Sequence, residues 1–325
     1  MNLSKLTILS SGDGLSIKSR AKFFYQANFQ ISKIEKNEFI NRFRFGGHKA
    51  LRENLILGLR CAGIEFELSN QIPINQSNIG LLAGKELLRK LTHDQKPKIG
   101  NIVVGPNLFV TPKGFEAELK NELIKKIVVP SQWVADLWTK EAPEISNKIV
   151  VWAVGIDFNY WQPLKGESEN LINKVLIYMK NRDVLLINQV QSLLKENGFL
   201  VSIITYGMYS EEDYREELRS SIALVYIGES ESQGIALLEA WATNVPTFVY
   251  NSKKTILIQT KTGVISLSGN NYSPAPYLTD ERGHFWSDAN ELLVHLKDLD
   301  KYTPRKASKI FSAEICAIEY NKLFA

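Results

Sequence analysis

Short apolar runs and stretches of helical periodicity alternate along most of the chain. The runs are rich in β-branched residues and closed by polar turns, as is typical of strands buried on both faces of a parallel sheet. Predicted strands lie at residues 6–9, 64–68, 99–104, 127–130, 149–152, 175–179, 199–205, 222–227 and 247–250. Apolar side chains recur at helical spacing over residues 49–61, 113–126, 131–137, 185–194, 235–243, 291–299 and 307–324. This alternation predicts an α/β protein.

Length and composition are those of an ordinary globular protein of two domains. The chain has 325 residues, 44% of them hydrophobic and 23% charged, and two domains of this size can each bury a core. No apolar stretch approaches the length of a membrane helix, and the first residues lack the apolar core of a signal peptide. The two cysteines, Cys61 and Cys316, fall in helical, partly apolar patterns and indicate buried free thiols in a reducing, cytoplasmic compartment.

One βαβ unit, residues 222–250, carries the clearest candidate chemistry. Its first strand leads into the polar loop 228–234, and a helix follows over 235–243. Asn244 stands where a left-handed residue ends a helix, before the second strand. Ligands of open parallel sheets bind at the carboxyl ends of the strands, so the loop is the expected site.

Two carboxylates bracket the start of this helix, Glu231 in the loop and Glu239 eight residues later. A carboxylate accepts hydrogen bonds from vicinal hydroxyls, and the free N–H groups between the two favour a phosphate. A nucleotide sugar has hydroxyls at both ends and phosphates in the middle, so it fits this arrangement. The alternative, a helix with an acidic first turn and an exposed glutamate, remains open on the pattern alone.

The segment from Glu231 to Pro246 resembles the E-x7-E motif of retaining GT-B glycosyltransferases, especially glycosyltransferase family 4. Both glutamates match the motif, as do Gly234, an aliphatic residue at 235, Leu238, Ala240, Ala242 and Pro246. Ser232 and Gln233 replace the usual glycine and aromatic residue. The resemblance implies two Rossmann-like parallel-sheet domains that face each other across a cleft. Residues 1–155, completed by a terminal helix at 308–325, would form the first domain, and residues 156–307 the second.

Other segments are similar to further parts of the same family. Gly46 and Gly47 open a helix, as does the family's glycine-rich loop, and Gly207 follows a strand where relatives approach the nucleotide. Basic residues after the first strand of the second domain contact the diphosphate in the family; here Lys180 and Arg182 both qualify. Many relatives place a histidine in the first domain facing the sugar. This chain has Asn107 at the matching strand end, so either His48 or Asn107 would serve on the acceptor side.

The resemblance implies transfer of a sugar, with retention of configuration, from a nucleotide-sugar donor to a hydroxyl of a glycan, polysaccharide or glycolipid. Glu231 with Lys180 or Arg182 would carry the catalysis. The donor, a UDP- or GDP-sugar, would also contact Gly46, Gly47, Gly207, Ser232, Gln233, Gly234, Ile235 and Glu239. No metal is expected. The alternative is a catalytically silent nucleotide-sugar-binding or scaffold protein of the same fold.

The charge distribution and the motif content narrow the functional classes to which the protein could belong. Residues 1–150 hold 22 Lys and Arg against 14 Asp and Glu, so this half could attract an anionic acceptor or a membrane surface, or be a solvated basic face. No basic run interleaved with aromatics indicates nucleic acid. No G-x-G-x-x-G follows a strand, which disfavours a nicotinamide or S-adenosylmethionine enzyme. The four histidines show no metal-binding spacing, and D-x-D at Asp298–Asp300 is interpreted as surface charge.

Overall fold

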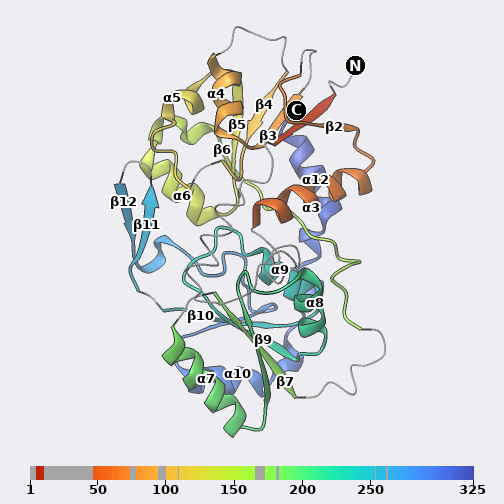
Figure 1. Ribbon diagram of the computed structural model, residues 1–325, viewed down its shortest axis with the longest axis vertical. Helices are drawn as coiled ribbons and strands as arrows, with labels where there is room; N and C mark the ends of the chain where they lie inside the picture. The colour runs from red at the N-terminus through yellow and green to blue at the C-terminus, as the bar shows by residue number, and fades with distance from the viewer. Residues whose placement is uncertain are drawn as a thin grey trace, which may run out of the picture.

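The computed structural model consists of two parallel sheets, each covered by helices and stacked along the long axis of the molecule (Figure 1). This arrangement confirms the predicted α/β class with two parallel-sheet domains. The structure describes residues 5–10, 47–73, 78–93, 100–108, 110–164, 173–180, 183–252, 254–260 and 263–325.

The first sheet has six parallel strands in the order β2-β1-β3-β4-β5-β6. The strands are β1 (Leu6–Ser10), β2 (Phe66–Ser69), β3 (Asn78–Ala83), β4 (Ile102–Val104), β5 (Ile124–Val129) and β6 (Ile149–Val151). In the described part of the chain, the helices that connect them are α3 (Gly47–Cys61), α4 (Lys85–His93), α5 (Glu116–Lys120) and α6 (Gln132–Glu141). The inner strands are almost wholly buried, because helices cover both faces of a parallel sheet.

The second sheet has five parallel strands in the order β13-β10-β9-β7-β8. The strands are β7 (Lys174–Met179), β8 (Leu200–Thr205), β9 (Ala223–Ile227), β10 (Thr247–Tyr250) and β13 (Gly283–Trp286). The helices are α7 (Val184–Glu196), α8 (Glu211–Arg219), α9 (Ile235–Ala242) and α10 (Ala289–Leu296). The predicted boundary at residue 155 falls in the connection between β6 and β7.

The chain ends beside the first sheet. The short helix α11 (Pro304–Ala307) precedes α12 (Ala313–Lys322), which packs along α3 in the upper half of Figure 1. The two helices approach closely at Gly58, where a Cβ atom would lie 2.1 Å from the carbonyl oxygen of Ala313. The indole of Trp152 also donates a hydrogen bond to the carbonyl of Cys316 (2.8 Å). The C-terminal helix thus packs into the same hydrophobic core as α3, with Cys316 buried as predicted, whereas Cys61 at the end of α3 is exposed.

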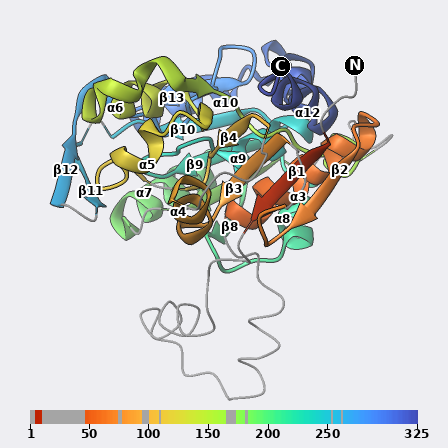
Figure 2. The same ribbon diagram turned by 90° about the horizontal axis from the view of Figure 1, so that it is seen from above.

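A hairpin that the sequence did not indicate joins the two halves at one edge. Strands β11 (Ile256–Thr260) and β12 (Gly263–Leu267) pair antiparallel and lie beside α6 (Figure 2). Ile256 and Leu267 pack with Leu137 of α6 in a small apolar cluster. This packing, more than local propensity, holds the hairpin in place, since β-propensity depends on context.

Several predicted elements differ in their bounds or their caps. The helix expected over 113–126 is only α5, because Asn121 takes an extended conformation (ψ 133°) and Ile124 already starts β5. The helix expected over 307–324 is interrupted before α12, whose N-cap is Ser312. Helix α6 begins after Ser131 as predicted, but the Ser131 hydroxyl makes no capping bond.

Within the described ranges, no helix combines the length and the apolar character needed to cross a lipid bilayer.

Candidate functional site

A cavity lies between the two halves, at the carboxyl ends of the strands of the second sheet. Its lining draws on both halves of the chain, although the two parts are far apart in sequence. The first half contributes Ala50, Leu51, Asn107 and Pro130, and the second contributes Tyr178, Lys180, Tyr206, Tyr209 and residues 231–236. This is the position at which open α/β sheets bind ligands.

Parallel pairing brings the three lining segments of the second half together. Strand β7 pairs with β8 on one side and with β9 on the other, so their carboxyl ends meet at one edge. Just past that edge, the backbone N–H of Lys180 donates to the carbonyl of Ile227 (2.9 Å), and that of Tyr206 donates to the carbonyl of Met179 (2.8 Å). The register of the sheet therefore fixes where Lys180, Tyr206 and the loop that follows β9 emerge.

The Glu231 carboxylate is the centre of a polar contact set in this cavity. It accepts hydrogen bonds from the ammonium of Lys180 and from the hydroxyl of Tyr226. The side chains of Lys180 and Glu231 are 29% and 14% exposed, so both are partly shielded from water. Burial, and then the negative charge of Glu231, raise the pKa of Tyr226 well above its usual value. The Tyr226 hydroxyl is therefore protonated and acts as a donor to the carboxylate.

The backbone of Glu231 is held from two sides. Its N–H donates to the carbonyl of Ser273 (2.9 Å), and its own carbonyl accepts from the indole N–H of Trp133 (2.8 Å). Trp133 lies on α6 in the first half, so this bond crosses the interface between the halves. Fixing both backbone groups limits the directions in which the Glu231 side chain can point, which is a form of preorganisation.

Two residues further on, Gln233 ties the loop to the connection between the sheets. Its amide donates to the carbonyl of Val154 (2.8 Å) and accepts from the N–H of the same residue (3.1 Å). Gln233 is 5% exposed and Val154 is 1% exposed, so water cannot readily replace these bonds. Gln233, which replaces the aromatic residue usual in the resembled motif, thus forms a cross-connection between the two halves.

Helix α9 starts at the cavity wall with an unobstructed N-terminus. Its N-cap is Gly234, with φ of 84°, a left-handed conformation that favours glycine. Among the described residues, the structure shows no acceptor for the N–H groups of Ile235 and Ala236, and both residues line the cavity. Such N–H groups, with the positive end of the helix dipole, can bind an anion.

Aromatic side chains form the remaining wall. The Lys180 ammonium lies 5.0 Å from the centre of the Tyr206 ring, which is 38% exposed. Behind it, the hydroxyls of Tyr178 and Tyr209 are hydrogen-bonded (2.6 Å), and Tyr178 stacks on Tyr226 at a centroid distance of 5.2 Å. The cavity therefore offers a cation, a carboxylate, free backbone donors and an accessible ring within one small volume.

No known protein-family model matches this chain, and no curated protein matches it. Solved structures do match. TarM aligns with a TM-score of 0.54 at 12% identity, over 76% of this chain and 54% of its own, so the chain spans about half of TarM. A glycosyltransferase from Rickettsia africae ESF-5 aligns with a TM-score of 0.51 at 12% identity, over 100% of this chain and 98% of its own. The GtfA/B complex aligns with a TM-score of 0.51 at 10% identity, over 86% of this chain and 60% of its own.

The fold is GT-B. Two parallel-sheet α/β domains in this arrangement, shared with the three solved structures, establish it. At identities of 10–13% the likeness speaks for the fold alone.

The GT-B structure places most of the predicted site residues together. Lys180, Glu231, Ser232, Gln233, Gly234, Ile235 and Asn107 all line the cavity. Gly207 directly follows Tyr206, with φ of 78°, but is not part of the lining. Gly46 and Arg182 lie outside the described residues. Gly47 is the first residue of α3, and the side chain of His48 is not among those described.

Glu239, the second glutamate of the motif, lies deeper in the protein than Glu231. Its side chain is fully buried, and it does not line the cavity. Helix α9 is buried on nearly every side from Leu237 to Ala242, and Glu239 lies within this buried stretch. A carboxylate with no exposed surface contacts a ligand only if its surroundings move.

The residues around the cavity that were not predicted from the sequence include Trp133, Pro130, Tyr178, Tyr226, Tyr206 and Tyr209. Tyr226 sits inside an apolar strand and Trp133 is 98 residues from its partner in the chain, so both resemble core residues. For Tyr206, the one available signal was its place beside Gly207 at a strand end.

Replacing Gln233 by leucine should destabilise this GT-B chain by about 1–3 kcal/mol, because it leaves the buried N–H and C=O of Val154 without partners. Urea denaturation of the two proteins measures the difference. Gln132→Leu is the control, since the Gln132 amide is exposed and donates to the exposed carboxylate of Asp136 (2.8 Å). Equal stability of Gln233→Leu and wild type would show that the cross-connection contributes nothing.

Proposed function

We propose that this chain transfers a sugar from a nucleotide-sugar donor to a hydroxyl of a carbohydrate or glycolipid acceptor, with retention of anomeric configuration. The observation that carries the proposal is the convergence, in one interdomain cavity, of Lys180, Glu231 and the free N–H groups at the start of α9. Lys180 and the N–H groups suit the diphosphate of such a donor, and the Glu231 carboxylate suits its sugar hydroxyls. Fold similarity supports the proposal but identifies no substrate.

The diphosphate of the donor would lie against Lys180 and the first turn of α9. Within the described lining, Lys180 and Glu231 are the charged residues, and they are paired with each other. A bound diphosphate would share the ammonium with Glu231, and the N–H groups of Ile235 and Ala236 would supply further neutral donors. Fixed donors aimed at developing negative charge stabilise a departing phosphate. Arg182 stays a second candidate for this role.

The sugar would lie against Glu231. Its carboxylate can accept hydrogen bonds from sugar hydroxyls, and its fixed backbone would orient the anomeric carbon toward the acceptor. In the proposed step, the bond from the anomeric carbon to the phosphate oxygen breaks and its electron pair stays on that oxygen. The acceptor oxygen bonds to the same face of the carbon, and the departing phosphate oxygen takes the acceptor proton. No separate base is then needed.

The transfer is proposed to need no metal ion, because Lys180 and the helix N-terminus would offset the charge of the leaving diphosphate. Transfer should therefore proceed unchanged in the presence of EDTA.

The nucleobase would stack on Tyr206, whose exposed ring is the accessible aromatic surface of the cavity. Tyr206→Ala should weaken nucleoside diphosphate binding by about 0.5–1.5 kcal/mol, roughly two- to tenfold, which is the scale of an aromatic contact. Isothermal titration calorimetry measures the change. Tyr206→Phe keeps the ring and should bind as the wild type does; equal weakening in both variants would argue against stacking.

A panel of UDP, GDP, ADP and CMP, followed by thermal shift, tests the donor class. UDP or GDP should raise the melting temperature in a concentration-dependent way, since a ligand that binds the native state stabilises it. Stabilisation by NADH or S-adenosylmethionine, with none by any nucleoside diphosphate, would contradict the proposal.

A catalytically silent nucleotide-sugar-binding protein is the second candidate. The observation that favours it is Asn107, which lines the cavity where the resembled family often has a histidine facing the sugar. Such a protein would bind the nucleotide but release no nucleoside diphosphate from any donor.

The acceptor and its location are proposed from charge. The first 150 residues carry an excess of basic residues, so an anionic acceptor or a peripheral contact with an anionic membrane fits this half. Sedimentation with vesicles that contain anionic lipid would test the membrane contact. The proposed compartment is the cytoplasm, where nucleotide sugars and free thiols coexist.

A further inference from the structure

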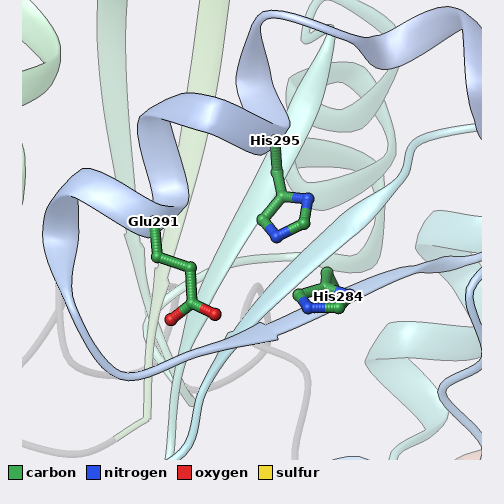
Figure 3. A group of neighbouring side chains, drawn as sticks. All are labelled: His284, Glu291 and His295. Carbon is green, nitrogen blue, oxygen red and sulfur yellow. The ribbon is translucent and has the colours of Figure 1, made fainter.

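Two histidines and a glutamate meet on the second domain, outside the cavity. His284 lies on β13, and Glu291 and His295 lie one turn apart on α10 (Figure 3). The ligand atoms of the three side chains all lie within 4.8 Å of one another. Their spacing in the sequence matches no metal motif, and the expectation that the histidines form no metal site rested on that spacing. The fold, not the spacing, brings them together.

The local structure explains why His284, Glu291 and His295 lie close together. β13 is the edge strand, with His284 opposite Phe248 of β10, and the chain then turns back into α10. Glu291 and His295 are four residues apart, so they share one face of the helix. Leu292 and Leu296, on the adjoining face of the helix, are buried in the core and fix the helix against the sheet. The polar face is thereby held toward His284.

The neighbouring groups orient the three side chains. The His295 ring accepts from, or donates to, the Tyr302 hydroxyl through Nδ1 (3.0 Å), which leaves Nε2 as its available ligand atom. One carboxylate oxygen of Glu291 accepts from the backbone N–H of Ser287 (3.1 Å), and the other is available. The two imidazole rings are only 4.0 Å apart between centroids. Hydrogen bonds of this kind commonly fix the orientation of metal ligands.

The chemistry of the donor set defines the ion. Two imidazoles and one carboxylate are ligands typical of Zn²⁺, whereas Mg²⁺ and Ca²⁺ prefer oxygen ligands alone. Three protein ligands leave a fourth position for water, and the cluster is partly exposed to solvent. Asp280, with a carboxylate oxygen 4.0 Å from His284 Nδ1, adds a negative charge beside the cluster.

We propose that His284, Glu291 and His295 bind a divalent transition-metal ion of the Zn²⁺ class. The ion connects the edge strand β13 to α10 and stabilises this side of the second domain. It has no part in the transfer, because His284 is near the amino end of its strand and the cavity lies at the carboxyl ends.

The test titrates Zn²⁺ into the full chain, purified without a histidine tag and freed of metal by a chelator. Calorimetry should show one ion per chain, and Zn²⁺ but not Mg²⁺ or Ca²⁺ should raise the melting temperature. His284→Asn and Glu291→Gln should each weaken binding by more than about tenfold, since even partners of the ligands change metal affinity by that amount.

His93→Asn is the matched control, because His93 is an exposed histidine at the end of α4. It should keep the affinity of the wild type. Circular dichroism of the metal-free variants checks that they fold, and Glu291→Gln keeps an acceptor for Ser287. Failure of the wild type to bind Zn²⁺, or equal binding by wild type, His284→Asn and Glu291→Gln, would overturn the proposal without touching the proposed transfer.

Discussion

Lys180→Met is expected to lower kcat/KM for the nucleotide-sugar donor by about 10²–10³-fold, the scale on which removal of one preorganised charge-stabilising donor acts. The substitution keeps the length of the side chain but removes the ammonium that contacts Glu231 and that would offset the leaving diphosphate. Most of the loss should appear in kcat, since charge develops on the phosphate in the transition state. Steady-state kinetics of nucleoside diphosphate release measures it.

Lys174→Met is the control on the same strand. Lys174 is the first residue of β7, and its ammonium lies 2.8 Å from the Glu217 carboxylate. Its side chain is 20% exposed, close to the 29% of Lys180, so both substitutions remove a partly shielded ion pair. Only removal of the Lys180–Glu231 pair, at the carboxyl end of β7, should lower turnover. An equal loss in the two variants would mean that Lys180 matters for stability and not for the donor.

Glu231→Gln is expected to weaken donor use by roughly 1–3 kcal/mol, or about 5- to 150-fold in kcat/KM, the scale of a hydrogen bond to a charged group. The amide keeps the shape of the side chain but loses the charge that holds Lys180, Tyr226 and, as proposed, the sugar hydroxyls. Glu229→Gln, an exposed position in the same loop, should change kcat/KM by less than about twofold. The same donor-release assay compares the two variants. Wild-type turnover by Glu231→Gln would remove this residue from the site.

The double variant separates two explanations of these losses. If Lys180 acts only by positioning Glu231, adding Lys180→Met to the Glu231→Gln variant should lower kcat/KM little further. If Lys180 contacts the diphosphate itself, Lys180→Met should still lower kcat/KM by a large factor in the Glu231→Gln variant. A double-mutant cycle on kcat/KM gives the coupling energy directly.

Local patterns in the sequence were enough to predict the βαβ unit around the site. The apolar run, the polar loop and the helix of residues 222–250 follow local rules, and Asn244 adopts the expected left-handed conformation, with φ of 66°. The loop and Lys180 also reach one cavity, as expected from the carboxyl-end rule for parallel sheets.

Contacts between distant segments could not be predicted in the same way. The partner of the Glu231 carbonyl, Trp133, belongs to the other half of the chain, and nothing in its own surroundings marks it. The hairpin β11–β12 has a weak pattern because it depends on packing against α6. The spacing of Glu231 and Glu239 likewise did not predict their different exposure: Glu231 lines the cavity, whereas the packing around α9 buries Glu239 completely.

The most direct test of the proposed transfer is release of nucleoside diphosphate from a panel of UDP- and GDP-sugars by the wild-type chain and Lys180→Met, with a mixture of carbohydrate and glycolipid acceptors. The wild type should consume at least one donor, in EDTA as well, and the product should keep the anomeric configuration of the donor by NMR. Lys180→Met should be slower by about two to three orders of magnitude. The account would be contradicted if the wild-type chain released no nucleoside diphosphate from any donor. It would also be contradicted if the wild type and Lys180→Met released nucleoside diphosphate at the same rate.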